Sequence, residues 1–100
     1  MATYVIFNNV VTDAQKMAKY VGRAFELIEA SGGEVLVFDE ESTILEGDSG
    51  LPRTIVLRFN SRDEAEAWYH SPAYREILPL RLEATVGTAR IVDDYSAATV

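Results

Sequence analysis

The fold is decided by residues 53–65, Arg-Thr-Ile-Val-Leu-Arg-Phe-Asn-Ser-Arg-Asp-Glu-Ala. The part up to Phe59 is rich in β-branched and large apolar side chains, which is typical of a strand. Ser61 and Glu64 then stand three residues apart, the spacing of a capping box at a helix N-terminus. Apolar side chains at helical spacing follow, namely Ala65, Trp68 and Tyr69. We therefore predict a strand that passes directly into a short helix.

The same order occurs earlier in the chain. Residues 4–11 indicate a strand, and Thr12 with Gln15 fits a second capping box in which Thr12 is the N-cap. The apolar residues that follow have the spacing of one helix face: Ala14, Met17, Ala18, Val21, Ala24, Phe25 and Ile28. The pair Gly32-Gly33 ends this pattern as a helix C-cap does. A long amphipathic helix is therefore predicted over one face of the core.

The segment between these two units indicates another strand. Residues 34–38 are apolar enough for it, and we expect it to continue at residues 43–45 after the acidic residues 39–41. Residues 47–52 have the glycine, aspartate, serine and proline content of a loop.

The C-terminal part begins with a helix restart. Ser71 and Pro72 suit the N-cap and the first helical position, and Tyr74, Ile77 and Leu78 form the expected buried side. Residues 89–95 indicate the last strand.

Strand, helix and strand thus occur twice, which indicates a ferredoxin-like βαββαβ sandwich of the α+β class. Right-handed connections place the helices on one face of a four-stranded antiparallel sheet. We expect one domain over residues 1–96 and a loose tail over residues 97–100.

The predicted strands are apolar on both faces. Val35 and Val37 alternate with Leu36 and Phe38, so each face of that strand would carry apolar side chains. Helices can cover only one face of the sheet, and a second copy of the same sheet is the simplest cover for the other. We therefore expect a homodimer.

Composition narrows the function classes. The chain has 100 residues with 48% hydrophobic content and a net charge of −7, and its basic residues are scattered, so nucleic acid and membrane surfaces are not expected partners. It has no cysteine and a single histidine, so we expect no metal site, no haem and no other cofactor. The N-terminus has no signal-peptide pattern, and a cytoplasmic location is expected.

A run of aromatic and hydrogen-bonding residues suggests a pocket wall, because tryptophan and tyrosine combine a flat apolar surface with a polar donor. The candidates for ligand binding here are Trp68, Tyr69, Ser71 and Tyr74. The alternative is that the rings anchor the short helix and Ser71 only caps the next one.

Charged residues give the remaining candidates. Arg81 follows Ile77 on the apolar side of its helix, if the helix continues past Pro79, and its guanidinium needs a carboxylate, carbonyls, water or a bound anion. Arg53 and Glu46 flank the loop before the third strand. The alternative for these three is an internal salt bridge. The weak catalytic candidates are His70, the sole group with an ordinary pKa near neutrality, and Glu46.

These residues also carry a family resemblance. The chain resembles a bacterial family known as domain of unknown function 1330, within the dimeric α+β barrel superfamily, through Gly32-Gly33, Glu46-Gly47, Pro52-Arg53, Ala67-Trp68-Tyr69, Ser71-Pro72, Tyr74 and Pro79-Leu80-Arg81. The resemblance implies a ferredoxin-like fold and a dimer joined through the sheets, and it implies no particular reaction. The chain departs from the family pattern at Glu34, Asp39 and Glu40, where arginine and glycine are typical of the family.

Two hypotheses follow. In the first, a homodimer binds a small organic molecule between sheet and helices, with or without acting on it as an enzyme. In the second, the protein is a non-catalytic structural or regulatory dimer whose candidate residues only pack and form salt bridges.

Overall fold

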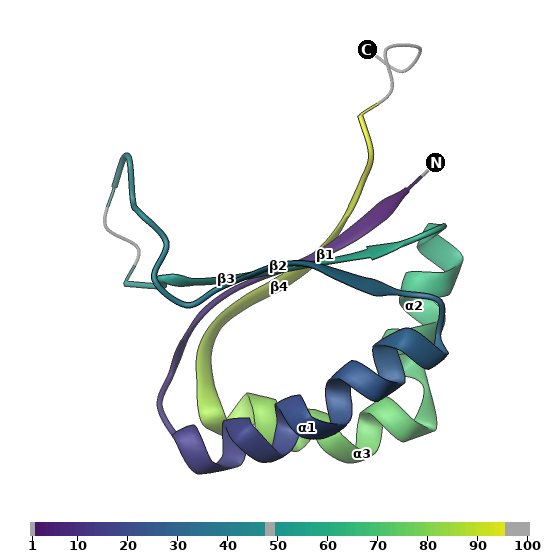
Figure 1. Ribbon diagram of the computed structural model, residues 1–100, viewed down its shortest axis with the longest axis horizontal. Coiled ribbons are helices and arrows are strands. Elements are labelled where there is room, and N and C mark those ends of the chain that lie inside the picture. Colours follow the sequence, from purple (N-terminus) through teal and green to yellow (C-terminus); the bar gives the residue numbers. More distant parts are fainter. Residues whose placement is uncertain (1, 48–49, 96–100) are drawn as a thin grey trace.

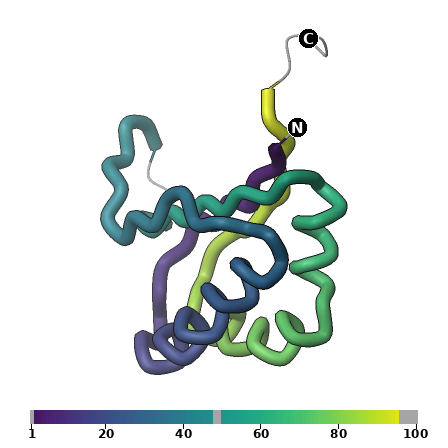
Figure 2. Tube along the Cα trace, turned by 45° about the vertical axis from the view of Figure 1, so that its right-hand side comes forward, coloured from purple at the N-terminus to yellow at the C-terminus, as the bar shows by residue number. Residues whose placement is uncertain are grey.

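The computed structural model describes residues 2–47 and 50–95. Its elements follow in the order β1 (Thr3–Val11), α1 (Ala14–Ala30), β2 (Glu34–Asp39), β3 (Arg53–Phe59), α2 (Arg62–His70), α3 (Pro72–Ala84) and β4 (Thr85–Asp93). The helices lie on one side of a single curved sheet, with α1 and α3 side by side and α2 near one end (Figure 1). Figure 2 shows the same two layers from a view turned by 45°. The predicted α+β class and helices on one face are confirmed.

The sheet has the strand order β2-β3-β1-β4, and all neighbouring strands are antiparallel. At its centre Val5 of β1 lies opposite Leu57 of β3 and Ile91 of β4. In β1 and β3, side chains alternate between buried positions that face the helices and half-buried positions that face away. This is the topology of a ferredoxin-like sandwich.

The core lies between the sheet and the helices. Its largest fully buried side chains come from β1, β3 and the two C-terminal helices, and α1 completes it with an apolar stripe. The core residues include Val5, Phe7, Met17, Tyr20, Ala24, Ile28, Ile55, Leu57, Phe59, Trp68, Tyr74 and Ile77.

Two of the three predicted helix starts are confirmed and one is wrong. The Ser61 hydroxyl accepts from the Glu64 amide at 3.2 Å, and the Ser71 hydroxyl accepts from the Tyr74 amide at 3.2 Å. The N-cap of α1 is Asp13, whose carboxylate accepts from the backbone amide three residues on, and not Thr12. The Thr12 amide instead donates to the carbonyl of Ala84 at 2.7 Å, which ties the start of α1 to the end of α3.

The predicted boundaries of two strands are also wrong. Residues 43–45 form no strand, and β2 ends at Asp39. The last strand begins at Thr85 and not at residue 89, because α3 continues through Pro79 to Ala84 and the chain then turns directly into β4. The predicted loose tail at residues 97–100 lies outside the described residues.

A β-bulge in β2 overturns the predicted alternation of that strand. Val35 pairs with Leu57, but Val37 pairs with Val56 and Phe38 pairs with Ile55, so Leu36 is an extra residue in the ladder. The bulge shifts the side-chain period by one. Phe38 therefore points to the helix side, where a strict alternation would have placed Val37.

The paired glycines before β2 have separate structural reasons. Gly32 adopts a φ of +83°, a left-handed conformation that favours glycine after a helix. A Cβ on Gly33 would lie only 2.7 Å from the ring of Phe59. The first glycine lets α1 end, and the second lets the turn pack against β3.

Candidate ligand-binding site

A cavity lies between the sheet and α1. It is lined by side chains of β1, β3, α1 and the end of α3, together with Phe38 of β2: Phe7, Asn9, Met17, Tyr20, Val21, Ala24, Phe25, Ile28, Phe38, Arg53, Ile55, Leu57 and Arg81. The inner part has a volume of about 30 Å³, which is room for about two water molecules. A wider hollow of about 470 Å³ adjoins it and shares Met17, Val21, Phe38 and Arg53 with it.

Arg81 forms one side of the polar end of this cavity. It is 7% exposed, and its Nε donates to the Tyr74 hydroxyl at 3.3 Å. Its guanidinium lies 5.0 Å from the centroid of the Phe7 ring, a cation–π contact that holds the charged group in place. The Tyr74 hydroxyl lies 2.6 Å from that of Tyr20, so a chain of hydrogen bonds runs from α3 to the cavity wall on α1.

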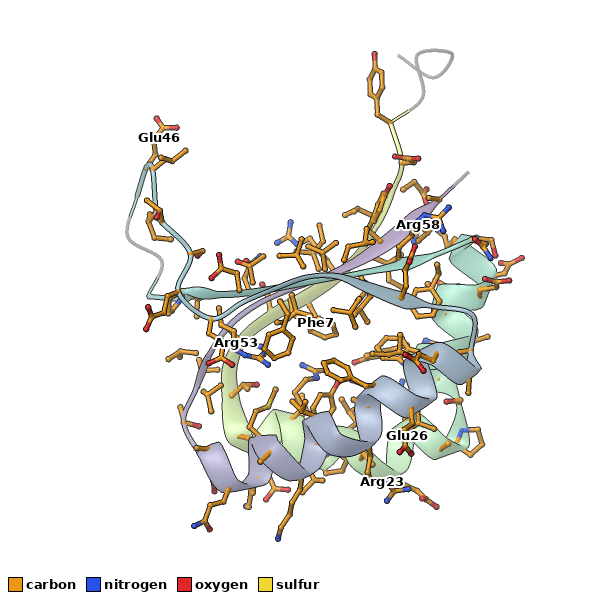
Figure 3. All side chains as sticks on the ribbon, in the orientation of Figure 1. Phe7, Arg23, Glu26, Glu46, Arg53 and Arg58 are labelled. Atoms are coloured by element: carbon orange, nitrogen blue, oxygen red, sulfur yellow. The ribbon has the colours of Figure 1, made fainter. Side chains whose placement is uncertain are left out.

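Arg53 also lines this cavity. It is 5% exposed, and its Nη1 donates to the Asn9 side-chain oxygen at 3.3 Å across the β1–β3 pair. Its guanidinium lies 4.9 Å from the centroid of the Phe38 ring. Figure 3 shows Arg53 and Phe7 pointing into the space between the sheet and α1.

Within the part of the chain that the structure describes, neither guanidinium has a carboxylate partner. Over residues 2–47 and 50–95 the ion pairs are formed by Lys16, Arg23, Arg58 and Arg62, on the surface. The charge of Glu40, at the outer hollow, acts on Arg53 from beyond ion-pair distance. A guanidinium offers several N–H donors, and here the protein accepts from one on each arginine. Arg81 also acts on the Tyr20 hydroxyl, which lines the cavity, and lowers its pKa against the larger effect of burial.

Burial shapes the protonation of this cluster. It raises the pKa of the Tyr20 hydroxyl well above its ordinary value, and the adjacent Tyr74 raises it further, so Tyr20 is a neutral hydrogen-bond donor. Burial lowers the pKa of Arg53, with the charge of Glu40 opposing that change. For Arg81 burial acts in the same direction, but Tyr74, Tyr20 and Tyr69 together outweigh it and the pKa is raised. Both arginines stay cationic.

Two aromatic rings stand at the mouth of the cavity. Phe25 of α1 and Phe38 of β2 meet edge to face with ring centroids 5.9 Å apart, and both are partly exposed. Phe38 also contacts the Arg53 guanidinium and borders the outer hollow. Phe38 lines both the outer hollow and the inner cavity, whereas Phe25 lines only the inner cavity, so a ligand that extends from one space to the other contacts Phe38.

The aromatic candidates from the sequence lie behind the cavity wall. Tyr74 reaches the site through its hydroxyl, whereas Trp68 packs against the rings of Phe59, Tyr69 and Tyr74. The Trp68 Nε1 is buried and has no hydrogen-bond partner among the described residues. Ser71 caps α3 and donates to the Trp68 carbonyl at 2.8 Å, so it holds the corner between α2 and α3.

The two catalytic candidates lie away from the cavity. Glu46 is exposed at the tip of the loop between β2 and β3, on the side of the sheet away from the helices (Figure 3). His70 is exposed at the end of α2, where its Nδ1 lies 2.7 Å from the Arg75 guanidinium. The structure therefore brings Arg53, Arg81 and Tyr74 together and places Glu46 and His70 elsewhere.

Sequence reasoning missed Tyr20, Asn9 and Phe38. Tyr20 stands three residues after Met17, so its spacing alone would have placed it on the buried face of α1. Asn9 follows Val5 and Phe7 at a period of two, which marks a polar side chain facing the core. No such signal existed for Phe38, because the bulge changes the period of its strand. Across the part of the chain that the structure describes, no group of three or more acidic or histidine side chains could hold a metal ion.

The fold and this site define the class of protein, a ferredoxin-like α+β domain with a cavity between its sheet and its helices. The sequence profile of the family named domain of unknown function 1330 matches residues 2–95, so the chain belongs to that family. This confirms the resemblance seen in the sequence. Among curated proteins, none matches the chain significantly.

Solved structures share the fold at low sequence identity. A protein of unknown function from Rhodopseudomonas palustris, RPA0582, is 18% identical with a TM-score of 0.74, covering 91% of this chain and 78% of that one. A hypothetical protein from Arabidopsis thaliana is 12% identical with a TM-score of 0.68, covering 96% and 89%. SnoaB from Streptomyces nogalater, a cofactor-independent oxygenase, is 8% identical with a TM-score of 0.64, covering 96% and 95%.

Proposed function

We propose that this protein binds a small organic anion in the cavity between the sheet and α1. The observation that carries the proposal is that Arg53 and Arg81 are buried, line one cavity and have no carboxylate partner among the described residues. A buried cation is costly unless it is paired. An anion between the two guanidinium groups would supply the missing charge.

The charge of the whole chain strengthens this reading. The chain carries a net charge of −7, yet among the described residues the lining of the inner cavity contains two cations and no anion. The chain has many acidic residues that would be able to neutralise these arginines through ion pairs. Glu40 acts electrostatically on Arg53 but lies beyond ion-pair distance of it. The arrangement supports a site that is neutralised by a ligand and speaks against internal salt bridges at Arg53 and Arg81.

The non-catalytic alternative makes a different use of the same residues. In it, the rings of Phe7 and Phe38 and the acceptors Tyr74 and Asn9 would be the only compensation for the two cations. A cation–π contact contributes about 0.5–2 kcal/mol, which is less than the several kcal/mol that burial of a guanidinium costs. Ligand binding is therefore the better account of the site.

Calorimetry and thermal melts test the proposal with compact carboxylates. We expect 4-methyl-2-oxopentanoate or benzoate to bind and to raise the melting temperature, and the uncharged ketone 4-methyl-2-pentanone to do neither. Arg53→Met should abolish the effect, whereas Arg75→Met, which removes an exposed arginine over Tyr69, should preserve it. Absence of binding by every carboxylate, with the fold intact, would overturn the proposed function.

We also propose that the sheet face opposite the helices packs against a second copy of the chain. Apolar side chains of four strands lie on that face, namely Tyr4, Ile6, Val10, Val37, Val56, Val86 and Val92. The loop between β2 and β3 rises on this side of the sheet at one end, and the end of β4 rises at the other (Figure 1). Leu45 in that loop is 91% exposed. A second sheet seated between the two projections would cover both the face and the loop.

The expected cytoplasmic location is part of this proposal, supported by the lack of cysteine in the sequence. Cell fractionation tests it. Among the described residues, no helix has the length and apolarity to span a membrane.

A further inference from the structure

We infer that the site selects anions whose polar atoms accept hydrogen bonds without donating any, such as a 2-oxo acid with an apolar body, and that Tyr20 is the residue that enforces this choice. The inference rests on the proposed function and goes further, since it names the ligand class. It follows from the direction of the hydrogen bonds around the cavity.

The hydrogen bond between Tyr74 and Tyr20 has one direction. The Tyr74 oxygen already accepts from Arg81 Nε at 3.3 Å, and the only other partner of this hydroxyl among the described residues is the Tyr20 oxygen at 2.6 Å. Tyr74 is fully buried, so its own proton has no water to reach. If Tyr20 donated to Tyr74, the Tyr74 proton would be left without an acceptor. Tyr74 therefore donates to Tyr20.

This direction releases the Tyr20 proton toward the cavity. The Tyr20 oxygen accepts from Tyr74, and Tyr20 lines the cavity, so its O–H is free to donate to a bound group. Burial keeps this hydroxyl neutral, because the pKa of Tyr20 is raised well above its ordinary value. Tyr20 is thus a permanent donor at the polar end of the cavity.

Asn9 adds a donor by the same logic. A guanidinium N–H can only donate, so the Asn9 atom that faces Arg53 at 3.3 Å is the amide oxygen. The Asn9 amide nitrogen is then the free group, and no acceptor bonds to it in the described part of the chain. Asn9, Arg53, Arg81 and Tyr20 therefore offer mainly donors to the inner cavity, and the proton of a ligand hydroxyl or ammonium would have to compete for the Tyr20 and Asn9 oxygens, which each already accept one hydrogen bond.

The rest of the lining determines the body of the ligand. Aliphatic and aromatic side chains make up the remainder of the inner wall, with the Phe25–Phe38 pair at its mouth. Glu40 lies at the outer hollow, where its charge would repel a second anionic group. The expected ligand is therefore a monoanion with its carboxylate and an adjacent carbonyl oxygen directed toward the polar end and its branched or aromatic body in the wider outer hollow.

Three matched carboxylates test the inference by isothermal titration calorimetry: 4-methyl-2-oxopentanoate, 2-hydroxy-4-methylpentanoate and 4-methylpentanoate. The first adds an acceptor to the last, and the second adds a group that brings its own proton. A net hydrogen bond of about 1 kcal/mol corresponds to a factor of about five in affinity. We expect the 2-oxo acid to bind at least about fivefold more tightly than each of the other two.

Variants locate the cause of that preference. Tyr20→Phe should bring the three affinities within about twofold of one another while carboxylate binding persists through the arginines. Tyr74→Phe keeps the Tyr20 hydroxyl but frees it to accept, so this variant should bind the hydroxy acid more tightly relative to the 2-oxo acid. Tyr69→Phe, which changes a tyrosine outside the cavity lining, is the matched control and should leave all ratios unchanged.

The outcomes separate the two proposals. Equal binding of all three carboxylates by the wild type, or an undiminished preference in Tyr20→Phe, would overturn the inference and leave anion binding standing. Failure of every carboxylate to bind would overturn the proposed function and the inference with it.

Discussion

The hydroxyl oxygens of Tyr20 and Tyr74 lie 2.6 Å apart and connect α1 to α3 inside the core. Their rings meet edge to face with centroids 6.1 Å apart, so both the polar and the apolar parts of the two side chains hold the helices together. Arg81 stands behind Tyr74 on α3. The polar end of the cavity is therefore attached to two helices at once, and changes to it should affect both stability and binding.

Alkaline titration tests the buried state of Tyr20. Its pKa is raised in the folded protein from an ordinary value of about 10, so the contribution of the neutral hydroxyl is fully present below pH 10 and is lost as the pH rises further, where the unfolded chain ionises first. The loss approaches about 1.4 kcal/mol per pH unit from this one group. Denaturant unfolding of wild type and Tyr20→Phe at several pH values should show a shallower decline in the variant. If the free energy of unfolding declined equally with pH in both proteins, Tyr20 would have the same pKa in the folded and the unfolded state, which would contradict the prediction.

Arg81→Met separates an internal salt bridge from a ligand site. Breaking a buried ion pair costs about 3–5 kcal/mol because it leaves a charge unpaired. Arg81 has no carboxylate partner among the described residues, and Arg81→Met loses its bond to Tyr74 and its contact with the Phe7 ring while it removes the cost of burying a cation, so we expect the free energy of unfolding to change by less than about 1.5 kcal/mol. Carboxylate-induced stabilisation should vanish. A loss as large as that of a broken ion pair, with no carboxylate response in wild type, would favour the structural hypothesis.

Val56→Asp tests the sheet-to-sheet dimer. Val56 lies on the face away from the helices, between Ile6 of β1 and Val37 of β2. An aspartate there would be an unpaired charge in a dry interface and should dissociate the dimer. Sedimentation at micromolar concentration should change from twice 11.1 kDa to 11.1 kDa. Ala67→Asp adds the same charge at an exposed position of α2 and should remain dimeric, whereas a monomeric wild type would contradict the proposal.

Two glycines form a matched pair for the packing at the start of β2. A Cβ on Gly33 would come within 2.7 Å of the Phe59 ring, so Gly33→Ala should destabilise the fold by about 1–3 kcal/mol. Gly22 lies in α1, where an added Cβ would meet nothing within 4 Å, and Gly22→Ala should stabilise the helix by up to about 1 kcal/mol. Chemical denaturation measures both. Equal changes in the free energy of unfolding would mean that the turn before β2 accommodates an added Cβ without strain.

The sequence predicts the elements best where local chemistry has a single solution. Arg53–Phe59 forms the predicted strand because its apolar residues are bounded by proline and by a serine that caps a helix. The start of α1 was wrong by one residue because Thr12 and Asp13 are both good caps, and the bond from Thr12 to Ala84 that decides between them joins distant parts of the chain. The length of α3 was hidden by Pro79, which ordinarily ends a helix.

The site was partly predictable for a similar reason. A charged residue within an apolar pattern is conspicuous, and Arg81 stands out on that ground, whereas Arg53 stands out because it flanks the loop before β3; both line the cavity. Nothing in the sequence marks Tyr20 as part of a binding site, because a tyrosine on the buried side of a helix is common. The position of Glu46 depends on the path of a loop, which local spacing does not specify.

The bulge at Leu36 makes the mouth of the cavity depend on the length of one strand. Deleting this extra residue would give a regular ladder in which Val37 still lies opposite Val56 and Phe38 still lies opposite Ile55, so Phe38 would stay on the helix side. One residue added between Val37 and Phe38 would instead move Phe38 to the opposite face of the sheet, leaving Arg53 without its ring and Phe25 without its neighbour. A gain of three nucleotides at that point would thus open the cavity to solvent with no residue of the polar end altered, whereas a loss of three at Leu36 would not.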